Sequence, residues 1–236
     1  MRQIPTMRAI TARPRARHLY RWTTGAVLAL ALAAVGCGSS SNNAPAKSNQ
    51  PAAHKGGTFT ILANSNFGTA DPAQNYTLEQ WMLLIDTHDG LMQFARVGGV
   101  AGTKLVPDLA TSIPTPTDGG KTYAFQIRKG IKFSDGTVMK PSDFTATLER
   151  QFTVPGPTSF YTGIVGAKQC TAKHCDLSQG VVADDSAYTL TIHLTAPDPE
   201  FLDKLALPFA YVVPASTSKK LTGNKVPPGT GPYMWK

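Results

Sequence analysis

The side chains with the most evident chemistry lie in one short stretch, where Cys170 and Cys175 enclose residues 171–174. Two thiols at this spacing can close a short disulfide, or they can join the imidazole of His174 in a metal site. A structural zinc site needs four ligands, and only three residues of a metal-binding type lie here. The choice between the two chemistries depends on the redox compartment.

Motifs of common hydrolases are absent from the sequence. It contains no G-x-S-x-G and no H-E-x-x-H, and His54, His88, His174 and His193 do not have the spacing of paired metal ligands. We therefore expect no catalytic residue, no metal and no cofactor. The members of a catalytic triad need not be adjacent in sequence, so an exported hydrolase stays open as an alternative.

The N-terminal region has the pattern of an export signal. Residues 1–36 contain six arginines and no acidic residue, and the apolar run GAVLALALAAV of residues 25–35 is too short to span a bilayer. Residues 34–37, AVGC, resemble the bacterial lipobox, in which the cysteine is acylated and becomes the mature N-terminus. We expect Cys37 to be lipidated, the alternative being an ordinary signal peptide followed by an unmodified cysteine.

Export has two consequences for the rest of the chain. Residues 37–56 are small and polar, which predicts a disordered tether between a lipid anchor and the folded part. An oxidising compartment favours the disulfide between Cys170 and Cys175 over the metal site.

The positive charge of the chain is concentrated in the export signal. Of the net charge of +8, the six arginines of residues 1–36 supply six, which leaves +2 for the remainder. A basic surface for nucleic acid is therefore not expected.

The clearest structural unit lies in residues 121–150, KTYAFQIRKGIKFSDGTVMKPSDFTATLER. Apolar residues alternate from Tyr123 to Ile127, which predicts a strand, and Ile131 and Phe133 continue the alternation. Residues 134–136, Ser-Asp-Gly, predict a turn. A helix is expected to begin near Pro141 and to bury a stripe through Phe144, Leu148 and Phe152.

Weaker patterns predict further elements on both sides of this unit. A helix is expected from the capping box Thr77–Gln80 to Gly90, with His88 packed on it rather than acting as a ligand or base. Strands are expected over residues 58–62, 188–194 and 211–214, and a short helix from Pro199, capped by Asp198.

Residues of the central unit also resemble a known family, the family 5 extracellular solute-binding proteins. The resemblance rests on Tyr123, Phe125, Arg128, Gly130, Phe133, Asp135, Gly136, Asp143 and Arg150, and on the GTGPY sequence of residues 229–233. It implies an α/β fold, a type II periplasmic-binding-protein-like lobe with mixed sheets. Residues 57–236 would form the N-terminal portion of the solute-binding domain, with the second lobe missing from a truncated chain.

This resemblance implies capture of a solute rather than catalysis. The chain would be the substrate-binding subunit of an ABC importer, would take a peptide or other small solute, and would deliver it to permease and ATPase subunits as a lipid-anchored monomer on the extracytoplasmic face of the cell membrane. Asn64, Ser65, Asn66 and Phe67 follow the first expected strand and are the candidate ligand contacts, the alternative being a polar turn. A surface adhesin or sensor is a further alternative.

Overall fold

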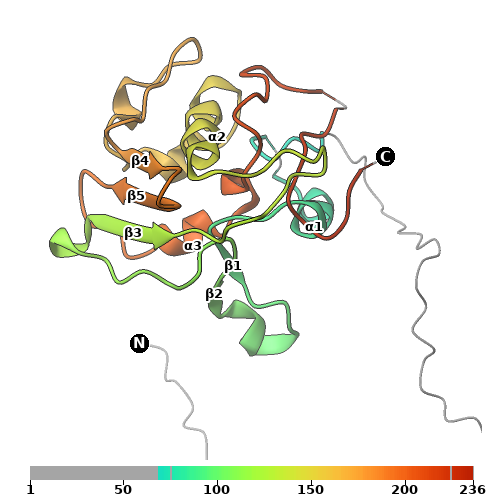
Figure 1. Ribbon diagram of the computed structural model, residues 1–236, viewed down its shortest axis with the longest axis horizontal. Helices are drawn as coiled ribbons and strands as arrows, with labels where there is room; N and C mark the ends of the chain where they lie inside the picture. The colour runs from blue at the N-terminus through green and yellow to red at the C-terminus, as the bar shows by residue number, and fades with distance from the viewer. Residues whose placement is uncertain (1–68, 75, 224, 236) are drawn as a thin grey trace, which may run out of the picture. The chain divides into compact units, whose positions relative to one another are not determined.

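The computed structural model describes residues 69–74, 76–223 and 225–235, which all lie in one unit of the chain, Phe59–Lys236 (Figure 1). The elements are α1 (Leu78–Thr87), β1 (Met92–Phe94), β2 (Leu105–Pro107), β3 (Thr122–Gln126), α2 (Pro141–Thr153), β4 (Val181–Asp184), β5 (Thr189–His193) and α3 (Phe201–Leu205), with short 3₁₀ turns between them. None of the described helices is long and apolar enough to cross a membrane.

The larger sheet is antiparallel, and its strand order is β3-β5-β4. Tyr123 lies opposite Ile192, and Phe125 lies opposite Leu190, so the apolar residues of β3 and β5 share one buried face. This is the outcome that the alternation in the sequence predicts, because successive side chains of a strand point to opposite faces.

Helix α2 packs beside this sheet, next to β4 (Figure 1). Pro141 is its first residue, and the Asp143 carboxylate accepts a hydrogen bond of 2.8 Å from the Lys140 backbone N–H at the N-terminus. Phe144 and Leu148 are fully buried, and Phe152 nearly so. The predicted helix and its buried stripe are therefore both present.

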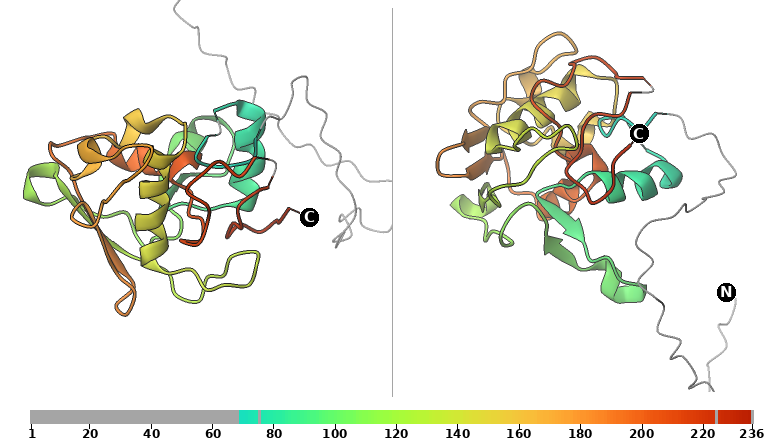
Figure 2. Two further views of the ribbon diagram at one scale, coloured as in Figure 1. Left: turned by 90° about the horizontal axis from the view of Figure 1, so that it is seen from above. Right: turned by 45° about the vertical axis from the view of Figure 1, so that its right-hand side comes forward.

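A second, two-stranded sheet is formed by β1 and β2, which project away from the larger sheet together with the turn at Gly99–Thr103 (Figures 1 and 2). Helix α1 precedes it and begins with the predicted capping box, in which the Thr77 N–H donates to Gln80 Oε1 at 3.3 Å. Both sheets pair only in the antiparallel sense, so the parallel pairs that a mixed sheet needs do not occur among the described strands.

A buried ion pair joins three distant segments of the chain. The Arg150 guanidinium donates to both Asp71 carboxylate oxygens, at 2.8 and 2.6 Å, and its Nε donates to the Ser218 carbonyl at 2.7 Å. Burial by itself would raise the pKa of Asp71, but the hydrogen bonds and charge of Arg150 outweigh it and hold the pKa below its ordinary value.

Two expected strands are absent from the described residues. Ile131 and Phe133 form no strand, because the turn at residues 134–136 reverses the chain and leaves only an isolated bridge between Lys132 and Val138. Residues 211–214 are buried but extended without a neighbouring strand. The expected strand over residues 58–62 lies outside the described residues.

The GTGPY segment packs tightly against the end of α1. The Gly231 N–H donates to the Thr87 carbonyl at 3.0 Å. A Cβ atom on Gly229 would collide with the same carbonyl and with the His88 ring, and a Cβ atom on Gly231 would collide with the Thr87 backbone. The glycines of this motif therefore permit close approach to the helix end.

Candidate functional site

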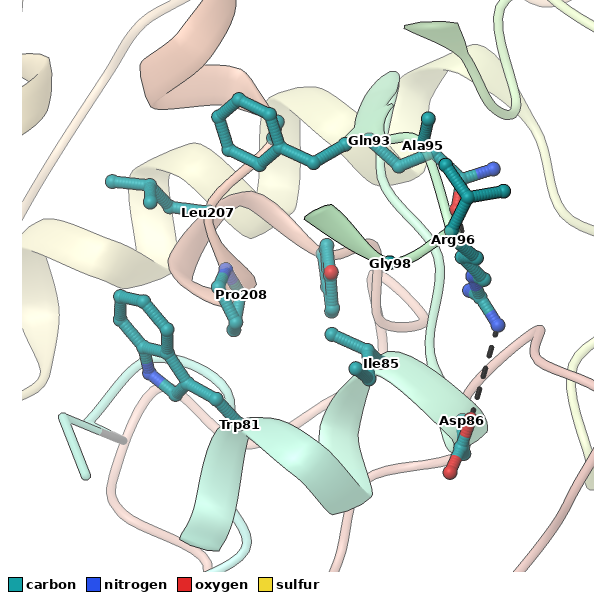
Figure 3. Close-up of a pocket in the computed structure, with 13 residues that line it drawn as sticks. Trp81, Ile85, Asp86, Gln93, Ala95, Arg96, Gly98, Leu207 and Pro208 are labelled. Atoms are coloured by element: carbon teal, nitrogen blue, oxygen red, sulfur yellow. Dashed lines mark hydrogen bonds and ion pairs between the residues drawn. The ribbon is translucent and has the colours of Figure 1, made fainter. Parts of the chain in front are cut away.

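A hollow of the described surface lies between α1, β1 and the turn at Pro208–Ala210 (Figure 3). Its volume is about 530 Å³, which falls in the range of small-molecule sites. The walls are mostly apolar and include Trp81, Ile85, Phe94, Leu207, Pro208 and Tyr211, and the polar edge includes Asp86, Gln93 and Arg96.

Local structure explains why these side chains meet. Trp81 and Ile85 are four residues apart on α1, so they stand one above the other on the same face of the helix. Figure 3 shows both pointing toward Leu207 and Pro208 across the hollow. The Trp81 ring also meets the buried Phe209 ring edge to face at a centroid distance of 5.7 Å, which fixes the wall of the hollow.

Arg96 dominates the polar edge of the hollow. Its Nη1 lies 3.9 Å from Asp86 Oδ1, its Nη2 lies 3.6 Å from Asp89 Oδ1, and its Nε donates to Gln93 Oε1 at 2.9 Å. The side chain is half-exposed, so each ion pair stabilises the fold by roughly 0 to 1 kcal/mol. The guanidinium is therefore held in position but remains open to a ligand carbonyl or carboxylate.

Two carboxyl groups lie behind this edge. The Asp89 carboxylate accepts a hydrogen bond from the Thr230 hydroxyl at 2.9 Å, and the Asp108 carboxylate accepts one from the Gly90 N–H at 3.1 Å. Burial raises the pKa of Asp89. Burial, followed by the charge of Asp89, raises the pKa of Asp108 to about 7. The pKa of Asp108 therefore lies close to neutral pH.

His88 is buried at the end of α1, where it links the helix to the C-terminal segment. Its Nε2 lies 3.1 Å from the Pro227 carbonyl, which can only accept, so Nε2 carries the proton. Nδ1 faces the Thr87 hydroxyl at 2.9 Å. Burial lowers the pKa of His88 to about 4. The neutral ring is packed at the end of the helix, as the sequence predicts for His88.

The residues predicted as sites from the sequence fall elsewhere. Cys37 and the candidate ligand contacts Asn64, Ser65, Asn66 and Phe67 lie outside the described residues. Cys170 and Cys175 are joined in a disulfide that closes the loop around His174. No cluster of three or more His, Cys, Asp or Glu side chains able to hold a metal ion occurs in the described parts of the chain.

Sequence reasoning missed Arg96, Asp89 and Asp108. The structural feature that brings Asp89 and Asp108 together is the pairing of β1 with β2, in which Met92 lies opposite Pro107. This register places Gly90 beside Asp108, since the two residues flank the paired strands. Neither strand exceeds three residues, so alternation along the sequence is too short to reveal the pairing.

Comparisons with known proteins agree on one family. The family model of bacterial extracellular solute-binding proteins, family 5 Middle, matches residues 104–236. The di/tripeptide-binding protein 1 of Pseudomonas aeruginosa is 31% identical over 186 residues, which are 70% of this chain and 32% of that protein. The dipeptide-binding protein of Escherichia coli K12 is 31% identical over 154 residues, which are 57% of this chain and 27% of that protein.

A comparison of the fold with solved structures also finds solute-binding proteins. The solved structure of clavulanic acid biosynthesis oligopeptide binding protein 2 superposes with a TM-score of 0.62 at 27% identity, covering 70% of this chain and 31% of that one. The chain thus spans about a third of the length of the relatives it matches, and those relatives are solute-binding proteins rather than enzymes. Members of this family are extracellular or periplasmic. The chain belongs to the bacterial extracellular solute-binding proteins, family 5.

Proposed function

We propose that this chain is part of the substrate-binding subunit of an ABC importer, which captures a peptide outside the cytoplasm and delivers it to a membrane permease driven by ATPase subunits. The observation that carries the proposal is the family match, together with relatives that are named for di- and tripeptide binding. The local geometry suits this role, because apolar walls for side chains adjoin Arg96 and Gln93, which can donate to peptide carbonyl groups.

The proposal is tested by ligand-induced stabilisation of the purified protein. Pools of di-, tri- and longer peptides are added, and the melting temperature is compared with that in sugar pools and in nickel. A ligand at a hundred times its Kd stabilises the folded state by about 2.7 kcal/mol. We expect a rise with peptides alone. A rise with sugars or nickel and none with peptides would reject peptide capture.

A matched pair of variants tests whether the hollow between α1 and β1 takes part. Ile85→Asp places a carboxylate on the apolar wall, whereas Met82→Asp places one on the exposed surface of the same helix, outside the hollow. We expect Ile85→Asp to weaken peptide binding by tenfold or more, since an unpaired charge in an apolar site is costly. Met82→Asp should bind like the parent protein. Equal binding by both variants would place the ligand elsewhere.

We also propose that the protein is a monomer held by lipid at Cys37, with Asn64, Ser65, Asn66 and Phe67 near the ligand. The support is the lipobox-like sequence of residues 34–37 and the position of the four residues directly after an expected strand. The extracytoplasmic location of the family agrees with a lipid anchor on that face of the membrane.

A further inference from the structure

A second, smaller hollow adjoins the first. Its volume is about 340 Å³, and it lies between β1, the turn at Thr158–Tyr161 and α3. Phe94 and Leu207 line both hollows. The two hollows therefore adjoin along these two side chains, and together they are called the groove.

The smaller hollow combines aromatic walls with uncompensated negative charge. Phe94 and Phe160 supply the rings, and Phe160 is fixed by stacking on the buried Phe209 at a centroid distance of 5.7 Å. Glu200 and Asp203 supply exposed carboxylates, and neither forms an ion pair with another described residue.

Lys204, which also lines this hollow, is paired with another carboxylate. The Lys204 ammonium lies 2.6 Å from Asp198 Oδ2, so its charge is compensated before any ligand arrives. The edge of the smaller hollow consequently carries a net negative charge. Aromatic faces and carboxylates together suit a side chain with an apolar stem and a cationic tip, which is the chemistry of lysine and arginine.

We infer that the groove selects peptides in which an apolar residue and a basic residue are two positions apart, with the apolar side chain beside Trp81 and the basic one beside Glu200 and Asp203. Side chains two positions apart in an extended peptide point to the same face, about 6.6 Å from each other. They therefore enter adjoining hollows, whereas the residue between them points away. This inference rests on the proposed peptide capture.

Three tripeptides and two variants of the full chain test the inference. The peptides are Phe-Ala-Lys, Phe-Ala-norleucine, which lacks the ammonium group, and Ala-Ala-Lys, which lacks the apolar side chain. The double variant Glu200→Gln with Asp203→Asn removes both carboxylates with little change of shape. Asp118→Asn removes an exposed carboxylate that does not line the groove and serves as the control. Binding is measured by calorimetry at low and high salt.

We expect the parent protein and Asp118→Asn to bind Phe-Ala-Lys about five- to tenfold more tightly than Phe-Ala-norleucine at low salt, and less so at high salt. The double variant should bind the two peptides within about twofold of each other. Ala-Ala-Lys should bind the parent more weakly than Phe-Ala-Lys. If peptides bind but the double variant keeps the preference for lysine, or if no preference exists, the inference is overturned while peptide capture stands. If no peptide binds at all, both are overturned.

Discussion

At the residue scale, Asp108 and His88 give the stability of the protein an unusual dependence on pH. The pKa of Asp108 rises from 3.8 to about 7 on folding, so its contribution to stability is full below pH 4 and is lost as the pH rises to 7. The pKa of His88 falls from 6.5 to about 4, so its contribution is lost as the pH falls from 6.5 to 4. Between pH 4 and 6.5, a rise in pH therefore increases stability through His88 and decreases it through Asp108. Above pH 6.5 only the decrease from Asp108 continues.

Asp108→Asn should separate these contributions. The amide oxygen still accepts the Gly90 N–H, but it has no charge to desolvate. We expect the stability of the variant relative to the parent to increase from pH 5 to pH 8 by up to about 2.5 kcal/mol, because the parent loses the contribution of Asp108 over about two pH units in this range. Urea denaturation at both pH values measures the difference. Asp118→Asn, an exposed site, is the control, and the same relative stability of Asp108→Asn at both pH values would contradict the shift.

The buried ion pair between Asp71 and Arg150 is a polar contact well suited to a mutation test. Both side chains are almost completely buried, so Asp71→Asn would leave the guanidinium without its counter-charge. We expect a loss of about 3 to 5 kcal/mol in the free energy of unfolding, measured by urea denaturation. Asp198→Asn removes a half-buried partner of Lys204 and should cost about 1 kcal/mol. Similar losses for the two variants would contradict the role of burial.

At the scale of elements, the end of α1 depends on the C-terminal segment that covers it. The Thr87 carbonyl accepts a hydrogen bond from the Gly231 N–H, and His88 Nε2 donates one to the Pro227 carbonyl. Gly229 and Gly231 also lie directly against the end of the helix. The short element α1 is therefore stabilised by a segment about 140 positions away in sequence.

Gly229→Ala tests this contact. The added Cβ would strike the Thr87 carbonyl and the His88 ring, so the segment must move away from the helix, at a cost of about 1 to 3 kcal/mol. Gly163→Ala, where a Cβ meets nothing within 4 Å, is the matched control and should be nearly neutral. Thermal unfolding compares the two. A neutral Gly229→Ala would mean that the segment does not pack as described.

The loop between Cys170 and Cys175 is the other element with its own test. In the chain-entropy model, closing so short a loop stabilises the fold by about 2 kcal/mol. The double variant Cys170→Ser with Cys175→Ser should therefore fold but melt at a lower temperature. Alkylation of the parent protein under denaturing, non-reducing conditions should modify neither thiol. Two free thiols in the exported protein would argue against the pairing.

At the scale of the whole molecule, the proposed lipid anchor at Cys37 would decide where the protein acts. Acylation of Cys37 would hold it at the membrane, because two or more acyl chains together bind a bilayer stably. Cys37→Ser should release the exported protein into the medium or the periplasm, as measured by fractionation and immunoblotting. Cys170→Ser, which lies in the folded part, should stay at the membrane. Retention of Cys37→Ser with the membrane would contradict the anchor.

The sequence by itself determined the parts whose signals are local. The alternation from Tyr123 to Ile127, the capping box at Thr77, Pro141 at the start of α2, and the family motifs are all read over a few residues, because strand and helix periodicities and caps depend on near neighbours. The same reading failed for Ile131 and Phe133 and for residues 211–214. Phe133 and residues 211–214 are buried without lying in a strand, so burial alone accounts for their apolar character.

Only the tertiary structure decided where the charged groups and the groove lie. Asp71 and Arg150 are far apart in sequence, as are Phe94 and Leu207, and they meet because α1, α2, the β1–β2 sheet and the C-terminal segment pack around common neighbours. Burial then sets the ionisation of Asp108 and His88, since desolvation depends on everything that surrounds a group in space and not on its neighbours in sequence.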